Sequence, residues 1–248
     1  MTRRLGLFGF GAFGRLIVQH LAPHFEILVH DPSPAAMREA RRWNVRPATL
    51  AEAAAAPLVV LAPPIDRLQA LAHEVAPFVR PRALVIDVAS VKVQPAVWLD
   101  TAIPDHADVI GAHPLFGPQS AKEGIRGLEV VICPVRSRRV ARVVNFLSSL
   151  GLRVTLDSPE NHDQALAAVQ GLTHLIAKVL SRLEPLPREH TTVSYDLVMK
   201  GASLVQGDSE DLFLAIERDN PYAADVRRRF LREVEALCAG LESHNRPA

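Results

Sequence analysis

A glycine-rich segment between an apolar run and a helical pattern constrains this chain more than any other feature. The apolar run at 5–8 predicts a short buried strand, and the sequence GFGAFG follows at 9–14 before an amphipathic pattern that continues to Leu21. In this setting the first glycine permits a tight turn, the second lets the backbone approach a pyrophosphate, and the third lets the helix pack on the strand. The segment therefore predicts the first βαβ unit of a dinucleotide-binding fold.

The predicted cofactor contacts lie in this segment and after the strands that follow it. A second strand at 26–30 ends in Asp31, 17 residues after Gly14, where a carboxylate would accept hydrogen bonds from the adenosine ribose. Asp31 would repel a 2′-phosphate, which favours NAD and leaves NADP as the less favoured cofactor; the alternative is that Asp31 caps a turn before the next helix. The predicted cofactor-binding residues are Gly9, Phe10, Gly11, Ala12, Phe13, Gly14, Asp31, Pro63 and Ser90.

Strands and helices alternate in the first part of the chain, and only helical patterns follow. Further apolar runs predict strands at 58–62, 83–88, 107–110, 128–133 and 152–156, in the order typical of parallel βα units. From Ser158 on, the apolar period is helical, beginning with a long apolar helix to about Leu183. We therefore predict an α/β fold, with an N-terminal Rossmann domain at 1–157 and an all-helical C-terminal domain at 158–248 whose apolar helices bury against one another or a second subunit.

The composition limits the classes of partner. The 28 Lys and Arg against 27 Asp and Glu give a net charge of +1, so no strong field favours nucleic acid or an anionic membrane. No run reaches the ~18 apolar residues of a membrane span, and no cleavage site follows the apolar start. The two cysteines, Cys133 and Cys238, indicate neither a disulfide framework nor a metal site. We expect a cytoplasmic protein that binds a small molecule and no metal.

Polar side chains follow two neighbouring predicted strands. His113 comes just after the strand at 107–110, in the sequence GAHPLFGP, whose prolines and glycine predict a rigid loop. Ser90 and Lys92 follow the strand at 83–88. Because open α/β sheets bind ligands beyond the carboxyl ends of their strands, we expect the three side chains to share one site. The alternatives are a structural histidine in a proline-rich turn and a serine that caps a helix.

These motifs resemble one family over nearly the whole chain. The sequences DVASVK at 87–92, AHPLFGP at 112–118, NHD at 161–163 and QGLTH at 170–174 are similar to those of the prephenate/arogenate dehydrogenases of tyrosine biosynthesis. The segment at 209–223 is most similar to the arogenate-type, plant-like branch. The resemblance implies a homodimer through the helical domain and an NAD(P)-dependent oxidative decarboxylation, either of arogenate to tyrosine or of prephenate to 4-hydroxyphenylpyruvate.

The resemblance also implies catalytic roles. His113 would accept the proton of the hydroxyl on ring carbon 4, as a general base near neutrality does. Ser90 would orient His113 and that hydroxyl, and His174 would line the pocket from the helical domain. The apolar period around His174 favours a different interpretation, a hydrogen-bonded core histidine.

The substrate contacts are less well defined. The arginine that bacterial prephenate-specific members place in a glycine-rich C-terminal stretch has no counterpart here, and Lys92 and Gln119 are the predicted substitutes, with Lys200 and Arg218 as further candidates. Asp211, or its neighbour Glu210, would pair with the ammonium group of arogenate. The alternative is a carboxylate that complements a helix dipole.

Two other classes of function fit parts of the pattern. Another two-domain Rossmann dehydrogenase, of the β-hydroxyacid or pyrroline-carboxylate type, would share the glycine segment and the helical domain but lack the HPLFGP sequence. A non-catalytic NAD-binding sensor would keep Asp31 and the glycines while losing His113, Ser90 and His174. Because all of these residues are present, both classes rank below the prephenate/arogenate dehydrogenase interpretation.

Overall fold

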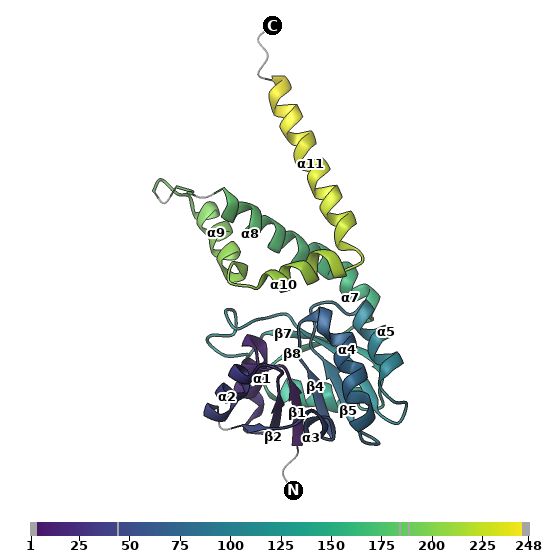
Figure 1. Cartoon of the computed structure of the whole chain (residues 1–248). Helices are drawn as coiled ribbons and strands as arrows, with labels where there is room; N and C mark the ends of the chain where they lie inside the picture. The colour runs from purple at the N-terminus through teal and green to yellow at the C-terminus, as the bar shows by residue number, and fades with distance from the viewer. Residues whose placement is uncertain (1–3, 44, 184, 188, 245–248) are drawn as a thin grey trace. The chain divides into compact units, whose positions relative to one another are not determined.

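The computed structural model describes residues 4–43, 45–183, 185–187 and 189–244, and the chain divides into two compact units, one ending at His162 and one beginning at Asp163 (Figure 1). The first unit holds an eight-stranded sheet in the order β3-β2-β1-β4-β5-β6-β7-β8. The strands are β1 (Arg4–Phe8), β2 (Glu26–His30), β3 (Arg46–Pro47), β4 (Leu58–Leu61), β5 (Leu84–Asp87), β6 (Asp108–Pro114), β7 (Glu129–Arg136) and β8 (Arg153–Leu156). The strand order reverses between β1 and β4, and the carboxyl ends of these two strands form the switch point where such sheets bind ligands. The predicted Rossmann-like α/β fold is confirmed.

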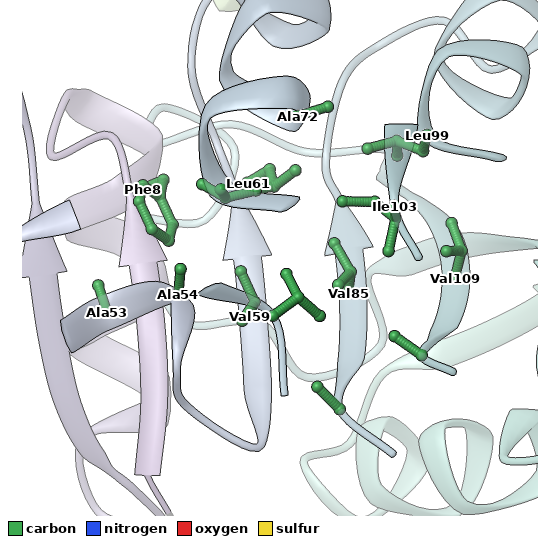
Figure 2. Packing of buried hydrophobic residues seen from close by; sticks show 14 of the residues in the cluster. Phe8, Ala53, Ala54, Val59, Leu61, Ala72, Val85, Leu99, Ile103 and Val109 are labelled. Atoms are coloured by element: carbon green, nitrogen blue, oxygen red, sulfur yellow. The ribbon is translucent and has the colours of Figure 1, made fainter. Parts of the chain in front are cut away.

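The helices of this unit connect the parallel strands. They are α1 (Ala12–Leu21), α2 (Pro34–Arg42), α3 (Leu50–Ala54), α4 (Ile65–Val75), α5 (Val93–Ala102) and α6 (Val140–Ser149), and α7 (Pro159–Leu166) begins at the end of the unit. The apolar runs that predict the strands become the core because a parallel sheet is covered on both faces. Figure 2 shows one layer of this core, in which Phe8, Leu61 and Val85 from three neighbouring strands pack under Ala72 of α4 and Leu99 of α5.

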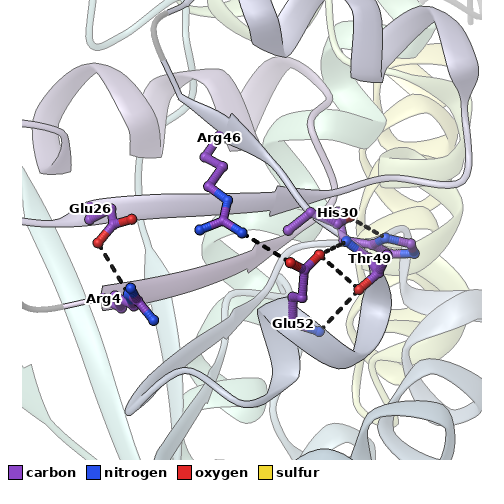
Figure 3. Close-up of polar contacts among 7 residues, drawn as sticks. Arg4, Glu26, His30, Arg46, Thr49 and Glu52 are labelled. Atoms are coloured by element: carbon purple, nitrogen blue, oxygen red, sulfur yellow. Dashed lines mark hydrogen bonds and ion pairs between the residues drawn. The ribbon is translucent and has the colours of Figure 1, made fainter.

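The short helix α3 is held at its start by side chains. Thr49 accepts a hydrogen bond from the backbone N–H of Glu52, and the Glu52 carboxylate accepts one from the backbone N–H of Thr49 (Figure 3). This capping box satisfies two of the backbone donors that a helix leaves unpaired at its start. The same carboxylate pairs with Arg46 on β3 at 3.0 Å, which fixes the edge of the sheet. The hydrogen bonds from Thr49 and the charge of Arg46 lower the pKa of Glu52.

The strand that carries His113 is longer than its apolar run predicts. Parallel pairing with β5 ends at Asp87 and Gly111, but antiparallel pairing with β7 continues and places His113 opposite Val131. The prediction that His113 lies in a loop just past the strand is therefore wrong, because the antiparallel partner extends β6 to Pro114. His113 nevertheless lies beyond the last residue of β5, at the edge of the sheet where ligands are expected.

The described residues of the second unit form helices. After the remainder of α7 come a π-helical turn (Ala167–Gly171), α8 (Leu172–Arg182), α9 (Val193–Val205), α10 (Glu210–Leu214), a second π-helical turn (Ala215–Asp219) and α11 (Ala223–His244). The predicted helical C-terminal part is confirmed. The predicted domain boundary at 157/158 falls at the start of α7, whereas the compact units divide within that helix, after His162. Within the described ranges, no helix is long and apolar enough to cross a membrane.

Candidate active site

Two glycines of the segment at 9–14 are required by close packing. Gly9 has a φ of +96°, its N–H donates to the carbonyl oxygen of His30 at 3.0 Å, and a Cβ there would lie 2.4 Å from the carbonyl oxygen of Ala62. A Cβ at Gly14 would lie 2.2 Å from the carbonyl oxygen of Gly9. No side chain fits at either position, so α1 packs directly against the turn that follows β1.

The middle glycine is different, and its surroundings fit a dinucleotide. A Cβ at Gly11 would meet nothing within 4 Å. Gly11 is the N-cap of α1, where no side chain caps the helix and no acidic residue lies in the first turn. Open space over an uncapped helix N-terminus suits a pyrophosphate, because backbone N–H groups and the helix dipole both favour an anion. The residues at 9–14 therefore fit the predicted role of holding a dinucleotide.

Asp31 connects this segment to the end of β2. Its Oδ2 accepts a hydrogen bond from the backbone N–H of Phe10 at 2.7 Å, and its Oδ1 accepts one from the backbone N–H of Ser33 at 2.8 Å. The N-cap of α2 is Ser33, whose hydroxyl accepts from the N–H of Ala36 at 3.3 Å. The carboxylate therefore holds the turn after β2 and the glycine segment together, and an ionised carboxylate retains further acceptor positions for a ribose hydroxyl.

The His113 side chain is nearly enclosed and contacts a second histidine. Its exposed fraction is 4%, and its Nδ1 lies 2.8 Å from Nε2 of His162, which belongs to α7 and is 1% exposed. Burial lowers the pKa of His113 well below its usual value of 6.5, and unfavourable electrostatic interactions with His162 and Lys92 lower it further. A neutral imidazole at this position has the protonation state of a base. His162 is absent from the predicted site residues.

Lys92 and Asp87 form a buried ion pair beside this histidine pair. The Lys92 ammonium donates hydrogen bonds to Oδ1 of Asp87 and, at 2.9 Å, to the carbonyl oxygen of Ala112. Burial raises the pKa of Asp87, and the Lys92 charge opposes that rise. Gly111 leaves room for the pair, since a Cβ there would lie 3.0 Å from Cδ of Lys92 and 3.2 Å from Oδ2 of Asp87. Lys92 thus joins the ends of β5 and β6, and its predicted contact with substrate stays a prediction.

The other predicted residues of the first unit lie after strands or in a turn. Ser90 is buried between β5 and α5, but α5 begins at Val93 with Lys92 as its N-cap and without a side-chain cap, so the alternative that Ser90 caps this helix is wrong. In the part of the chain that the structure describes, no hydrogen bond joins Ser90 to His113. Pro63 follows β4 and is half-buried, whereas Gln119 is exposed in a turn.

The second unit carries the remaining predicted site residues. His174 is buried, with Nδ1 2.9 Å from the carbonyl oxygen of Gln170 and Nε2 3.1 Å from Oδ2 of Asp208, as the core-histidine interpretation expects. Asp211 is exposed in the first turn of α10 and has no ion-pair partner among the described residues, while its neighbour Glu210 pairs with Lys178 at 2.5 Å. The site roles of His174 and Asp211 stay predictions. Over the described ranges, no three His, Cys, Asp or Glu side chains gather as a metal site requires.

Comparison with known proteins identifies the family. Residues 15–156 match the family model described as prephenate dehydrogenase, nucleotide-binding domain. The chain is 27% identical over 200 residues to a probable arogenate/prephenate dehydrogenase of Methanocaldococcus jannaschii, a match that covers 76% of this chain and 44% of that protein. It is 28% identical over 247 residues to arogenate dehydrogenase 2, chloroplastic, of Arabidopsis thaliana, covering 94% and 68%. The chain therefore spans less than half the length of the first of these relatives and about two thirds of the second.

A solved structure has the same fold. The crystal structure of prephenate dehydrogenase from A. aeolicus in complex with hydroxyphenyl propionate and NAD+ matches with a TM-score of 0.79 at 18% sequence identity, over 98% of this chain and 92% of that one. The family resemblance predicted from the motifs is thus confirmed by the family model, and the solved structure confirms the fold. Since the family model alone covers more than half of the residues, this chain belongs to the prephenate dehydrogenase family.

Proposed function

We propose that this protein is an NAD-dependent dehydrogenase that oxidatively decarboxylates arogenate or prephenate. The observation that carries the proposal is the enclosed His113, which burial and the neighbouring Lys92 ammonium keep neutral. It lies at the same sheet edge as an uncapped helix N-terminus with open space over Gly11. A base and a dinucleotide cradle at one edge of a sheet are what oxidation of a ring hydroxyl requires.

The first unit supplies the binding groups for the cofactor. Backbone N–H groups at the start of α1 hold the pyrophosphate, and the Asp31 carboxylate accepts a hydrogen bond from the adenosine ribose. A bound nicotinamide dinucleotide supplies the acceptor for the hydride that leaves ring carbon 4. The charge of Asp31 opposes a 2′-phosphate, which supports NAD over NADP.

His113 takes the proton from the ring hydroxyl in this proposal. Its Nε2 has no hydrogen-bond partner among the described residues, so this nitrogen is available to the substrate, whereas Nδ1 is occupied by His162. General-base assistance of this kind contributes on the order of 10²–10⁴-fold to the rate. Oxidation gives a ring dienone whose carbonyl is vinylogous to the carboxylate, because each ring double bond ends beside the saturated carbon that bears it. The electrons of the broken bond to CO2 then pass to the carbonyl oxygen and yield an aromatic phenol, which makes the overall reaction favourable.

The choice of substrate depends on the second unit. Asp211 presents an exposed carboxylate without an ion-pair partner in the described ranges, whereas Glu210 is neutralised by Lys178. An ammonium group, present in arogenate and absent from prephenate, is the natural partner of such a carboxylate. We therefore favour arogenate, with Gln119 and Lys92 as the proposed contacts to the rest of the substrate.

The partner proposed for the helical unit is a second copy of the chain. Helix α11 extends away from the other helices of its unit (Figure 1). One face of it carries Leu231, Val234, Leu237 and Leu241, of which the last two are 69% and 71% exposed. Exposed apolar residues also lie on α8 and α9: Ile176, Val179, Val193, Leu197, Val198 and Leu204. Apolar helix faces of this extent are typical of an interface between subunits.

The reaction is tested by mixing the purified protein with arogenate or prephenate, each with NAD or NADP, and following the absorbance of reduced nicotinamide. We expect turnover with arogenate and NAD, and a loss of at least 100-fold in kcat in His113→Asn, within the range for a general base. The affinity for NAD, measured by titration, should be the same in wild type and His113→Asn, which shows that the variant is folded. Binding of NAD without turnover in any of the four mixtures would contradict the proposed function.

A further inference from the structure

We propose that His162 is a positioning residue that holds His113 in the tautomer with its proton on Nδ1, so that Nε2 stays unprotonated and able to take the proton of the substrate. This inference rests on the proposed function, in which His113 is the base. It assigns a role to a buried histidine of the NHD sequence at 161–163 that is absent from the predicted site residues.

The contact between the two rings limits the number of protons they share. Nδ1 of His113 and Nε2 of His162 are 2.8 Å apart, which is a hydrogen-bond distance, and the ring centroids are 5.0 Å apart with the planes inclined at 66°. One nitrogen of such a pair must donate and the other must accept, because two N–H groups cannot point at each other at this distance. A single proton therefore lies between the rings.

Only one of the two arrangements leaves His113 able to act as a base. If Nδ1 of His113 donates to His162, the neutral His113 ring has its lone pair on Nε2. If His162 donates instead, the neutral His113 ring carries its proton on Nε2 and offers a donor to the substrate. The proposed reaction needs the first arrangement, in which His162 is the acceptor.

Both histidines are fixed by regular secondary structure. His113 is held in β6 opposite Val131 of β7, and His162 lies in α7, where its backbone N–H donates to the carbonyl oxygen of Ser158 at 3.0 Å. The two rings are enclosed, so bulk water does not compete for the shared proton. Residues on rigid elements orient a reacting group more accurately than residues on loops do.

The expected kinetic effect follows from the cost of a wrong tautomer. In serine proteases the carboxylate that orients the catalytic histidine is worth about 10⁴ in kcat. A neutral imidazole is a weaker acceptor than a carboxylate, so we expect a loss on the order of 10²-fold, at the low end of general-base contributions. Because His162 contacts His113 through the nitrogen away from the proposed substrate, the loss should fall on kcat and leave KM for both substrates within about twofold.

The test compares His162→Leu with His162→Gln in the full chain. Leucine removes the acceptor, whereas the amide oxygen of glutamine reaches the position of the imidazole Nε2 and retains it. NMR of protein labelled with ¹⁵N in the histidine rings reports the tautomer directly, with the His113 signals assigned from their loss in His113→Asn. We expect a protonated Nδ1 on His113 in wild type and in His162→Gln, and a shift toward protonated Nε2 in His162→Leu. The kcat of His162→Leu should fall about 100-fold, whereas the kcat of His162→Gln should stay within about tenfold of wild type.

The outcomes separate this inference from the proposed function. A proton on Nε2 of His113 in the wild-type spectrum overturns the inference whatever the activity, and this measurement holds even where His162→Leu fails to fold. A folded His162→Leu protein that keeps the wild-type tautomer or the wild-type kcat also overturns it. Absence of turnover by the wild type with every substrate, alongside a protonated Nδ1, overturns the proposed function and leaves the tautomer assignment standing.

Discussion

The backbone N–H of Phe10 donates a hydrogen bond to Oδ2 of Asp31 at 2.7 Å, which ties the glycine segment to the end of the neighbouring strand. The other carboxylate oxygen accepts the N–H of Ser33. Asp31 therefore shapes the loop that is proposed to hold the pyrophosphate and also carries the charge proposed to select the cofactor. A substitution that removes the charge and keeps an acceptor oxygen separates these two roles.

Asp31→Asn is expected to weaken discrimination against NADP. The asparagine retains one carbonyl oxygen for the Phe10 N–H, loses the second acceptor, and no longer repels a 2′-phosphate. The ratio of kcat/KM for NAD to that for NADP should fall by roughly tenfold, which corresponds to about 1.4 kcal/mol. Asp105→Asn, in an exposed turn before β6, is the matched control and should leave the ratio unchanged. An unaltered ratio in Asp31→Asn would mean that the carboxylate acts on the loop alone.

Two alanine substitutions in the glycine segment are expected to affect different properties, NAD binding at Gly11 and the free energy of unfolding at Gly14. At Gly11 a Cβ meets nothing within 4 Å and φ is −72°, so Gly11→Ala should melt within about 2 °C of wild type. It should nevertheless bind NAD at least tenfold more weakly, because its methyl group occupies the space left for the pyrophosphate. At Gly14 a Cβ would lie 2.2 Å from the carbonyl oxygen of Gly9, so Gly14→Ala should lose about 2 kcal/mol or more of unfolding free energy. Thermal melts and NAD titrations check both. Normal NAD binding by Gly11→Ala would rule out the proposed cradle.

The helices and strands that the sequence predicts well are those with long, regular patterns. The helical period from Ser158 to Leu183 corresponds to α7, a π-helical turn and α8, and the apolar run at 58–62 corresponds to β4. Such segments are predicted from the sequence because many residues contribute to one pattern. Helix α3 has only five residues and is stabilised by the reciprocal bonds of Thr49 and Glu52 rather than by an apolar period, so its pattern does not predict it.

The candidate site is predicted less completely, for two physical reasons. His113 is identified from its motif, but its place inside β6 depends on pairing with β7, a contact between segments that the connection at 115–128 separates. The contact of His113 with His162 joins residues 49 positions apart and leaves no periodic signal. In the same way, the buried ion pair between Lys92 and Asp87 is not predicted, since sequence order alone does not reveal which charges the fold encloses.

Stability is expected to fall as the pH decreases below the usual pKa of histidine. Burial, followed by unfavourable electrostatic interactions with His162 and Lys92, lowers the pKa of His113 in the folded protein. Between that lowered value and 6.5, the unfolded chain binds a proton that the folded chain does not. The free energy of unfolding then decreases with falling pH, by up to about 1.4 kcal/mol per pH unit from this group. Urea unfolding of wild type and His113→Asn near neutral pH and one unit below 6.5 checks this. Asp87, Lys92 and His162 surround the ring and are present in both proteins, so their contribution to the pH dependence is common to both. An equal loss of unfolding free energy in wild type and His113→Asn would contradict the assignment of the pH dependence to His113.

Charges placed on the apolar face of α11 are expected to separate the subunits of the proposed homodimer. Leu237 and Leu241 are exposed within one chain, so replacing both with glutamate costs little in the monomer but opposes burial in a dimer. Sedimentation equilibrium should give a dimer for wild type and a monomer for the double variant. Arg232→Glu, which introduces the same side chain on the opposite face of the helix, should remain dimeric. A wild-type monomer at micromolar concentration would contradict the proposed partner.

The position of β6 inside the sheet has a consequence for how the protein opens in the native state. β6 is hydrogen-bonded to β5 as far as Gly111 and to β7 as far as Pro114, so the backbone at His113 is released only when β6 separates from β7. Amide hydrogens in such central strands exchange with solvent through the rarest openings, whereas those of surface connections exchange through frequent local ones. The proposed base therefore belongs to the slowest-exchanging region of the unit, and heating should leave its geometry intact until the sheet itself unfolds.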